Sequence, residues 1–562
     1  MSNHEQNNKF ENLIYKILES RSKKLIIILL IALSFVGSLM MISSQIVLVR
    51  MLPSKSANTF NIYIDTLIGS SIEETTSVVE CVTSIIKKEK EVTDMELYFG
   101  EGSPLDYAGL VKGSALKNGE QYAEIVVNLT DQHERNEKSY DIVHRLRPQI
   151  QENCESLTKP TSIRMIEMPA GPPMLASIVI ELFGENNKKL INLSKEVAVI
   201  LGTTDGLVDI DIMADHSYEE YKIELNKEKV TRSNLDVAQI NSILYLAFQG
   251  VDVAVKNTTS SNSQIPIYVQ LSKNSKLLDE KTLENLQIKL SSLKLMNKEG
   301  LMIPLTEIAT IKRTKSDPMI YHKDLQNMVN VTAETDLVSQ VYPLLEARKM
   351  MIEYFSLNYD VTEHLSFSTY MFDLTLKDKE TGEKFLVRWD GEMKVSLDTF
   401  RDLGTAFLAA LLLIFIVFVI YYQSFSISSI ILGGSFLSII GVIVGHWIAD
   451  IFTSATFFLT ATSLIGFISL MGISSRNSLL MVDFTKGLIK KGIVKRRAIA
   501  IASAKRAKPI MLTAIAIILG SALLTSDPVF GGLGVALISG TVAAVIISLI
   551  LIPILMDNTK AI

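Results

Sequence analysis

Six long apolar runs constrain the fold of this 562-residue chain more than any other feature. Each is long enough to cross the hydrocarbon core of a bilayer, about 30 Å thick, as a helix. The runs predict membrane spans at residues 25–48, 403–422, 427–448, 457–482, 509–525 and 533–555. A long polar section separates the first span from the others. We therefore expect a polytopic α-helical membrane protein with one large extramembrane region.

Lysine and arginine bias sets the predicted orientation of these spans. Residues 486–508 contain nine lysines and arginines and no acid, and Arg21, Lys23 and Lys24 precede the first span. Such basic segments stay on the cytoplasmic side of a membrane. Counting spans from either cluster places both termini in the cytoplasm and residues 51–402 outside. This pattern predicts a multi-pass protein of the bacterial inner membrane with a large periplasmic domain.

Residues 1–24 predict a short amphipathic helix on the cytoplasmic face. Its apolar positions recur at helical spacing, with lysine and glutamate between them. They are Phe10, Leu13, Ile14, Ile17 and Leu18. A disordered tail is the alternative.

The outer section predicts two α+β modules and an insertion. Residues 51–168 alternate strands and helices in the order β-α-β-β-α-β. This order is the split βαβ, or ferredoxin-like, pattern. Residues 175–215 and 325–392 predict a second module of the same kind, interrupted by an inserted module at residues 216–324. The insertion contains further strands and a helix at residues 237–248.

Cys81 and Cys154 both fall in the outer section. A disulfide between them is compatible with a location outside the cytoplasm. Two unpaired, partly buried thiols are the plainer interpretation, and the sequence leaves both open.

No motif indicates an enzyme, since the sequence shows no phosphate-binding glycine-rich loop, zinc-type spacing or nucleophile motif. We therefore expect no catalytic residue, cofactor or bound metal. Met165, Met168 and Met174 could bind a soft metal ion, but methionine also fills irregular apolar gaps, and we favour that role. The net charge of −5 includes no basic excess, so no nucleic-acid partner is expected.

Arg476 is the residue that most needs a partner. It lies about ten residues before Lys486, which places it roughly 15 Å deep in the fourth span. A charge at that depth costs at least about 2.5–3.5 kcal/mol on insertion scales. No acid lies at mid-depth in any predicted span, so we expect Arg476 to meet a carboxylate on another polypeptide. The alternative is an Arg476 that is solvated in a cytoplasmic vestibule and paired with Asp483.

Arg506 and Thr513 form a second candidate site at the start of the fifth span. Pro509 suits the first turn of a helix, and Arg506 and Thr513 would then share one helix face, two turns apart. A hydroxyl below a cation could help to pass protons carried by water. Alternatively, Arg506 anchors the helix to the cytoplasmic face and Thr513 is a packing hydroxyl.

Eight stretches carry a recognisable family pattern. They are residues 388–392 (RWDGE), 400–404 (FRDLG), 460–466 (TATSLIG), 475–484 (SRNSLLMVDF), 506–514 (RAKPIMLTA), 526–530 (SDPVF), 106–111 (DYAGLV) and 171–173 (GPP). Together they make the chain resemble the C-terminal half of resistance-nodulation-division (RND) efflux permeases of the hydrophobe/amphiphile class. The resemblance covers nearly the whole chain.

This resemblance implies a trimeric, proton-driven exporter of small amphiphilic or hydrophobic compounds, with two six-helix halves per protomer. The two modules would be porter subdomains, and residues 216–324 would be a docking module that meets a periplasmic adaptor and an outer-membrane channel. Arg476 stands where a basic residue, lysine in many relatives, completes a proton relay with two aspartates of the N-terminal half. Arg506 and Thr513 match accessory relay positions, and Asp483 is a secondary candidate. The proton gradient would be the energy source.

The paired aspartates of an N-terminal half are not among these 562 residues. We therefore expect a separate N-terminal-half partner, with a naturally split gene favoured over a fragmentary gene model. Two other hypotheses are a membrane-anchored periplasmic scaffold or secretion helper without proton coupling, and a nonfunctional gene fragment. A neighbouring gene encoding six spans with paired aspartates would favour the transporter.

Overall fold

The fold comes from a computed structural model that describes residues 2–53, 56–104, 107–157, 161–168, 171, 173–214, 217–260, 264–272, 293–364, 370–453 and 457–561. Asp106, Pro172 and residues 215–216, which belong to segments discussed above, lie outside these ranges. The chain divides into two compact units, Asp215–Met319 and the remainder.

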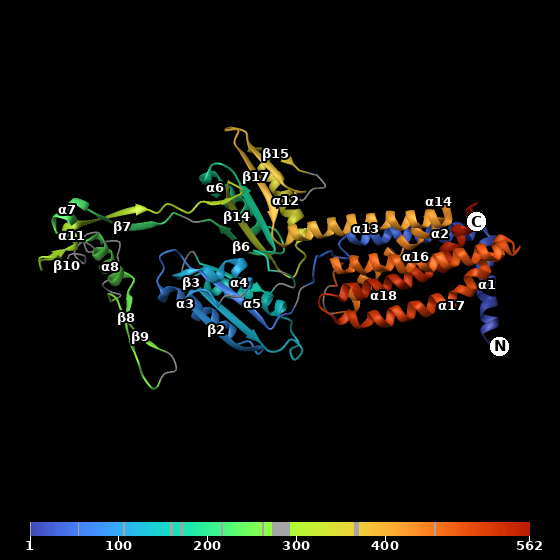
Figure 1. The fold of residues 1–562 in the computed structure, drawn as a ribbon, viewed down its shortest axis with the longest axis horizontal. Coiled ribbons are helices and arrows are strands. Elements are labelled where there is room, and N and C mark those ends of the chain that lie inside the picture. The colour runs from blue at the N-terminus through green and yellow to red at the C-terminus, as the bar shows by residue number, and fades with distance from the viewer. Residues whose placement is uncertain are drawn as a thin grey trace. The chain divides into compact units, whose positions relative to one another are not determined.

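Six helical segments in the described residues are long and apolar enough to cross a membrane (Figure 1). They are α2 (Arg21–Ser43), α13 (Glu392–Tyr422), α14 and α15 (Phe425–Phe436, Ile439–Phe452), α16 (Ala461–Lys490), α17 (Lys495–Ala522), and α18 and α19 (Gly531–Ile546, Ile552–Asn558). The predicted number of spans is confirmed.

Two boundaries differ from the predictions on the basic side of the helices. Residues 486–508 were expected to form a loop, but α16 continues to Lys490 and α17 begins at Lys495. Alanine, lysine and arginine are strong helix formers, so the helices extend well past the apolar run. The prediction that Pro509 occupies the first turn is therefore wrong, because Pro509 lies inside α17.

Helix α1 (Ser2–Glu19) precedes α2, and Ser20 caps α2 through its side chain. Ile14 and Leu18 are almost fully buried, in a cluster that includes Ile499 of α17 and Ile554 of α19. A helix thus lies where the amphipathic pattern predicts one, and its apolar side packs against other helices.

The first outer module contains the predicted element order. Its elements are β1 (Thr59–Asp65), α3 (Ile72–Ile86), β2 (Val92–Glu101), α4 (Tyr107–Lys112), β3 (Asn118–Leu129), α5 (Ser139–Cys154) and β4 (Ser162–Glu167). The strands form an antiparallel sheet in the order β2-β3-β1-β4. Apolar residues of the strands and of α3 and α5 form one core, which includes Ile62, Val82 and Ile142. The short helix α4 was not predicted.

The second module repeats this plan and extends it. Its elements are β5 (Ile178–Phe183), α6 (Asn187–Gly202), β6 (Leu207–Met213), β13 (Tyr321–Lys323), β14 (Gln326–Thr335), α12 (Val341–Phe355), β15 (Tyr359–Glu363), β16 (Leu374–Asp378) and β17 (Lys384–Asp390). Strand β14 pairs with β6 and β5, and β5 pairs with β17, so the order β6-β14-β5-β17 matches that of the first sheet. The additional strands β15 and β16 were not predicted.

The inserted unit has its own small core. It contains β7 (Glu219–Leu225), α7 (Lys227–Arg232), α8 (Val237–Phe248), β8 (Val251–Lys256), β9 (Ile265–Val269), β10 (Lys294–Met296), β11 (Met302–Pro304), α11 (Leu305–Ile308) and β12 (Ala309–Lys315). Strand β7 pairs with β12, and Val230, Ile240 and Leu295 lie in the core. Helix α8 has the bounds predicted for it.

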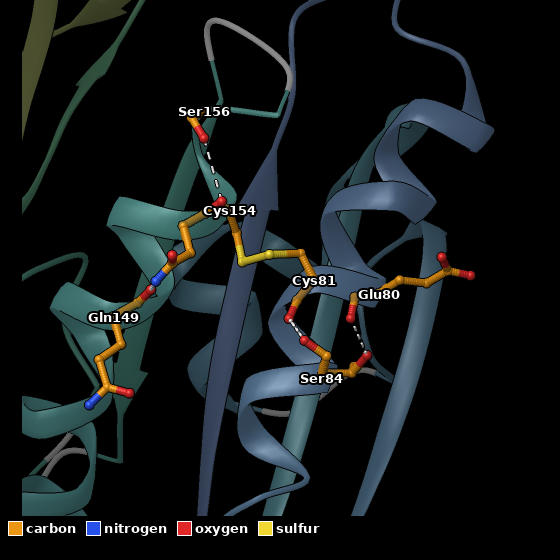
Figure 2. Close-up of a disulfide and its surroundings, with 8 residues drawn as sticks. Glu80, Cys81, Ser84, Gln149, Cys154 and Ser156 are labelled. Carbon is orange, nitrogen blue, oxygen red and sulfur yellow. Dashed lines mark hydrogen bonds between the residues drawn. A yellow bond between two sulfur atoms is a disulfide. The ribbon is translucent and has the colours of Figure 1, made fainter.

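A disulfide joins Cys81 of α3 to Cys154 of α5, and Figure 2 shows the two side chains pointing toward each other between the helices. The Cα atoms are 5.8 Å apart, within the usual range for a disulfide. The interpretation as two unpaired thiols is therefore wrong. Sequence spacing could not decide this point, because the two cysteines approach only when α3 and α5 pack on the same sheet.

Candidate functional site

Helix α16 carries several buried polar residues within the membrane bundle. It begins after Thr460, whose hydroxyl accepts from the Ser463 backbone N–H in a capping box. Arg476 lies near the middle of this 30-residue helix, roughly 22 Å from its first residue. Ser474, Asn477 and Ser478 are buried within the bundle, whereas the Arg476 side chain is exposed on the bundle surface.

Arg476 has no ion pair or hydrogen bond within the part of the chain that the structure describes. Asp483, the candidate partner on the same helix, instead accepts a hydrogen bond of 2.8 Å from the hydroxyl of Tyr422 at the end of α13. The Lys486 ammonium lies 4.9 Å from the centre of the Tyr422 ring. Tyr422 was not identified from the sequence, because 61 residues separate it from Asp483.

Arg506 and Thr513 lie on α17, as predicted, but the structure does not join them to Arg476. The Arg506 guanidinium stacks 4.9 Å from the centre of the Phe484 ring of α16. Its Nε atom is buried without a hydrogen-bond partner among the described residues. The Thr513 hydroxyl donates to the Pro509 carbonyl oxygen at 3.0 Å, one turn earlier. The two side chains therefore occupy separate local environments.

A buried polar cluster lies next to the start of α16. His446 of α15 is fully buried, with Nδ1 2.8 Å from the Val442 carbonyl oxygen and Nε2 2.8 Å from the Ser463 hydroxyl. The Ser463 hydroxyl also contacts the Thr460 hydroxyl at 3.0 Å. This network fixes the position at which α16 begins.

Charged side chains join three helix ends at the other end of the bundle. The Lys24 ammonium of α2 lies 2.8 Å from Asp557 of α19, and Arg496 of α17 donates to the same carboxylate at 3.2 Å. The two basic clusters that set the predicted orientation therefore meet on one side of the bundle.

A second polar centre lies between the two outer modules. Arg147 of α5 pairs with Asp336 at 2.8 Å and with Asp209 of β6 at 3.3 Å. Asp209 also accepts from the Met165 backbone N–H at 3.1 Å and from Gln151 at 3.0 Å. The Asp209 backbone has a φ of +52°, at a register irregularity between β6 and β14. Such an irregularity re-aims a side chain away from its own sheet.

Two more ion pairs cross the same boundary. Lys112 of α4 lies 2.7 Å from Glu334 of β14, and Arg164 of β4 lies 2.5 Å from Asp211 of β6. The sequence predicted neither pair, because each joins strands or helices that are distant along the chain.

A cavity of about 90 Å³ lies beside these ion pairs. Its lining includes Arg50, Glu167 and Glu392, together with Met168 and Met174. Burial raises the pKa of Glu167 to about 7, the largest effect, while Arg147 and Arg50 oppose it. Burial likewise raises the pKa of Asp209 to about 6 against the opposing effect of Arg147. Met165 is buried in the core of the first module.

The chain is similar to several curated proteins. Swarming motility protein SwrC of Bacillus subtilis (strain 168) is 22% identical over 386 residues, which are 67% of this chain and 32% of SwrC. Cobalt-zinc-cadmium resistance protein CzcA of Cupriavidus metallidurans is 21% identical over 411 residues, covering 72% of this chain and 35% of CzcA. Multidrug resistance protein MdtC of Escherichia coli O81 (strain ED1a) is 22% identical over 471 residues, covering 82% and 41%. The chain thus spans roughly a third to two-fifths of the length of these relatives.

The fold is similar to the crystal structure of a heavy metal efflux pump, with a TM-score of 0.70 and 15% sequence identity. The similarity covers 97% of this chain and 51% of the pump chain. The model of the AcrB/AcrD/AcrF family matches residues 2–557. With nearly every residue inside this match, the chain belongs to the AcrB/AcrD/AcrF family of RND efflux transporters.

Proposed function

We propose that this chain acts as one half of a proton-driven RND exporter, with Arg476 as its contribution to the proton relay. The observation that carries the proposal is the position of Arg476. It is a charged side chain near the middle of an apolar helix, exposed on the bundle surface, with no acid beside it among the described residues. A charge at mid-depth in a bilayer needs an opposite charge or a wet cavity. A partner bundle carrying carboxylates would supply that opposite charge.

The proposed mechanism is alternating access. Protonation of the partner's carboxylates would weaken their attraction to Arg476, because only the ionised carboxylate favours the charged guanidinium. One proton crossing 100 mV supplies about 2.3 kcal/mol. Helix displacements would then open and close the outer modules as near-rigid bodies. Arg506 and Thr513 are proposed as accessory relay residues and Asp483, held by Tyr422, as a secondary one.

We further propose an N-terminal-half RND chain as the partner, in a trimeric assembly that meets a periplasmic adaptor and an outer-membrane channel. The two outer modules would be ferredoxin-like porter modules, and residues 216–324 the docking module. We infer an inner-membrane location with both termini cytoplasmic. Support comes from the basic side chains that meet at Asp557 and from the disulfide, since disulfides persist in oxidising compartments such as the periplasm.

The proposed substrates are small amphiphilic or hydrophobic compounds. The name of the MdtC relative supports this class, whereas the name of CzcA refers to cobalt, zinc and cadmium. An export assay should therefore include a cationic dye and these three metal ions. Export of one of these metal ions, without any export of the dye, would contradict the proposed substrate class.

The test of the relay substitutes Arg476 in the complete transporter, co-expressed with its N-terminal half. Arg476→Ala should abolish proton-dependent export, and Arg476→Lys should retain part of it, because lysine preserves the charge without the planar fork of donors. Arg497→Ala is a matched control, because Arg497 is an exposed arginine on α17. Export by Arg476→Ala at the rate of the control would exclude the relay.

A further inference from the structure

The connector between α2 and the first outer module runs beside the segment that leads into α16. The Leu48 carbonyl oxygen accepts from the Leu459 N–H at 2.8 Å, and the Leu459 carbonyl oxygen accepts from the Arg50 N–H at 3.2 Å. Val49 and Leu459 form a parallel bridge. Two residues beyond this bridge on each segment, the Ala461 N–H donates to the Met51 carbonyl oxygen at 3.1 Å. The connector is thus bonded to the first residue of α16.

The other edge of this connector is bonded to the second outer module. The Val49 N–H donates to the Tyr342 hydroxyl at 3.1 Å, and the Val49 carbonyl oxygen accepts from the Ser339 hydroxyl. Ser339 and Tyr342 lie on either side of the point where α12 begins. Both polar backbone groups of Val49 therefore bond to the module, and its two neighbours bond to Leu459, two residues before α16. Backbone groups in such a place need these partners, because an unpaired buried group is costly.

The surroundings of this connector are closely packed. Ser339 is fully buried, Gln340 is 1% exposed, and Val47 is 2% exposed. Val47 and Leu459 share a core with Phe467, in the second turn of α16. Close-packed interiors have low compressibility and transmit displacement instead of absorbing it.

Helix α13 is also tied to this point. Gln340 donates through its side-chain amide to the Ser396 hydroxyl of α13 at 3.0 Å. The Thr399 hydroxyl, one turn further along α13, lies 3.8 Å from the Met51 sulfur. The start of α12 is thus connected to two membrane helices at once. One of them is α16, which carries Arg476.

We propose that residues 48–51 are a mechanical joint through which a displacement of α16 moves the second outer module, with Ser339 and Tyr342 as its positioning residues. This inference rests on the proposed function, because Arg476 must shift α16 when its partner is protonated. The joint acts in parallel with the covalent path, in which α13 continues directly from strand β17 through Gly391. Val49 is bonded to the start of α12 on one edge of the connector, and Leu48 and Arg50 are bonded to Leu459 on the other. A shift of Leu459 must therefore either carry the start of α12 with it or break these bonds.

The experiment uses the complete transporter in proteoliposomes, with the double substitution Ser339→Ala and Tyr342→Phe. Spin labels at Leu157→Cys and Leu345→Cys, both at exposed positions in the first and second modules, report the distance between the modules at pH 8 and pH 5. The native cysteines are in a disulfide and do not react. Export of a fluorescent cationic dye is measured on the same samples.

We expect the double variant to retain assembly but to lose the pH-dependent distance change and to export roughly tenfold more slowly, as expected for the loss of two buried hydrogen bonds. Tyr354→Phe is the matched control, because this tyrosine lies on the same helix and is 47% exposed. Where the double variant does not reach the membrane, Tyr342→Phe alone serves, with a smaller loss of export. This single substitution removes only the hydroxyl oxygen of a half-buried tyrosine.

Arg476→Ala separates the two proposals. Normal distance changes and export in the joint variants, with both lost in Arg476→Ala, would overturn the joint and leave the relay standing. Normal behaviour in all of these variants would overturn both. Loss of export and of the distance change in the joint variants and in Arg476→Ala, with the Tyr354→Phe control unaffected, supports the joint.

Discussion

Arg147 of the first outer module and Asp209 of the second are joined across the boundary between the modules, with Nε and Oδ2 3.3 Å apart. Among the described residues, the donors to the Asp209 carboxylate come from the first module, namely Arg147, Gln151 and the Met165 backbone. The carboxylate side chain is fully buried. One aspartate in the second module thus provides a central attachment point for the first.

Replacing Asp209 by asparagine should weaken this attachment. Asparagine tolerates the left-handed backbone of this position, so the change removes mainly the charge. Arg147 keeps Asp336 as a partner, and we expect a loss of about 1–3 kcal/mol in the free energy of unfolding of the outer region. Thermal unfolding of the purified protein measures it. Asp205→Asn, at an exposed position close by, is the control; an equal effect of the two changes would contradict the attachment.

Glu167 should make stability depend on pH near neutrality. Its pKa is raised to about 7 in the folded protein, chiefly by burial, from about 4.3 in an unfolded chain. The folded state binds the extra proton between these values, so this contribution is fully present below pH 4.3 and is lost as the pH rises through 7. The cost at pH 8 is at most about 4 kcal/mol.

Glu167→Gln should therefore unfold at a higher temperature than the unaltered protein at pH 8 and at a similar temperature at pH 4. Melting curves across this range measure the difference. Glu152→Gln, at an exposed glutamate on α5, should leave the pH profile unchanged. A Glu167→Gln profile parallel to that of the unaltered protein at every pH would show that this carboxyl titrates normally.

The disulfide between Cys81 and Cys154 should stabilise the first outer module. It closes a loop with a sequence separation of 73 residues, for which the chain-entropy model gives about 4 kcal/mol and measured native disulfides about 2–5 kcal/mol. Reduction, or the double change to serine, should make residues 51–168 more sensitive to proteolysis. Reductant should have no further effect on the serine variant. Labelling of the native protein by a maleimide before reduction would show that the disulfide does not form.

Cysteine accessibility tests the proposed orientation. Leu325 in the outer section is fully exposed, and Val494, between α16 and α17, is 76% exposed. In spheroplasts, a membrane-impermeant thiol reagent should label Leu325→Cys directly and Val494→Cys only after permeabilisation. The reverse pattern would invert the orientation. The native cysteines are joined in a disulfide and do not react with the reagent.

Local patterns explain which elements could be predicted from sequence. The apolar runs identified all six spans, and strand and helix periodicity identified both outer modules and helix α8. The predicted boundaries were less accurate where a helix continues beyond its apolar run. Helix α17 extends into a basic segment, and α13 begins at Glu392 although its apolar run begins about ten residues later. Short, charged strands such as β15 and β16 carry too weak a pattern to be detected.

Some features of the candidate site could likewise be predicted from the sequence, and others could not. The depth of Arg476 follows from counting residues along one helix, and the lack of an acid at mid-depth from reading all six spans. Its role in a proton relay is what the family resemblance implies, so the hypothesis needed only the sequence. The Tyr422 hydrogen bond to Asp483 and the stacking of Arg506 on Phe484 depend on how α13, α16 and α17 pack. No local pattern encodes that packing.

By itself, the sequence determined what depends on neighbouring residues. These features are the six spans, the order of strands and helices, the repeated modules and the burial cost of one arginine. Only the tertiary structure decided the contacts between distant segments, such as the disulfide, the Arg147–Asp209 pair and the bond between Val49 and Tyr342, which are 293 residues apart. The physical reason is that hydrophobic periodicity specifies which side of an element is buried, whereas partner choice requires the geometry of two packed surfaces.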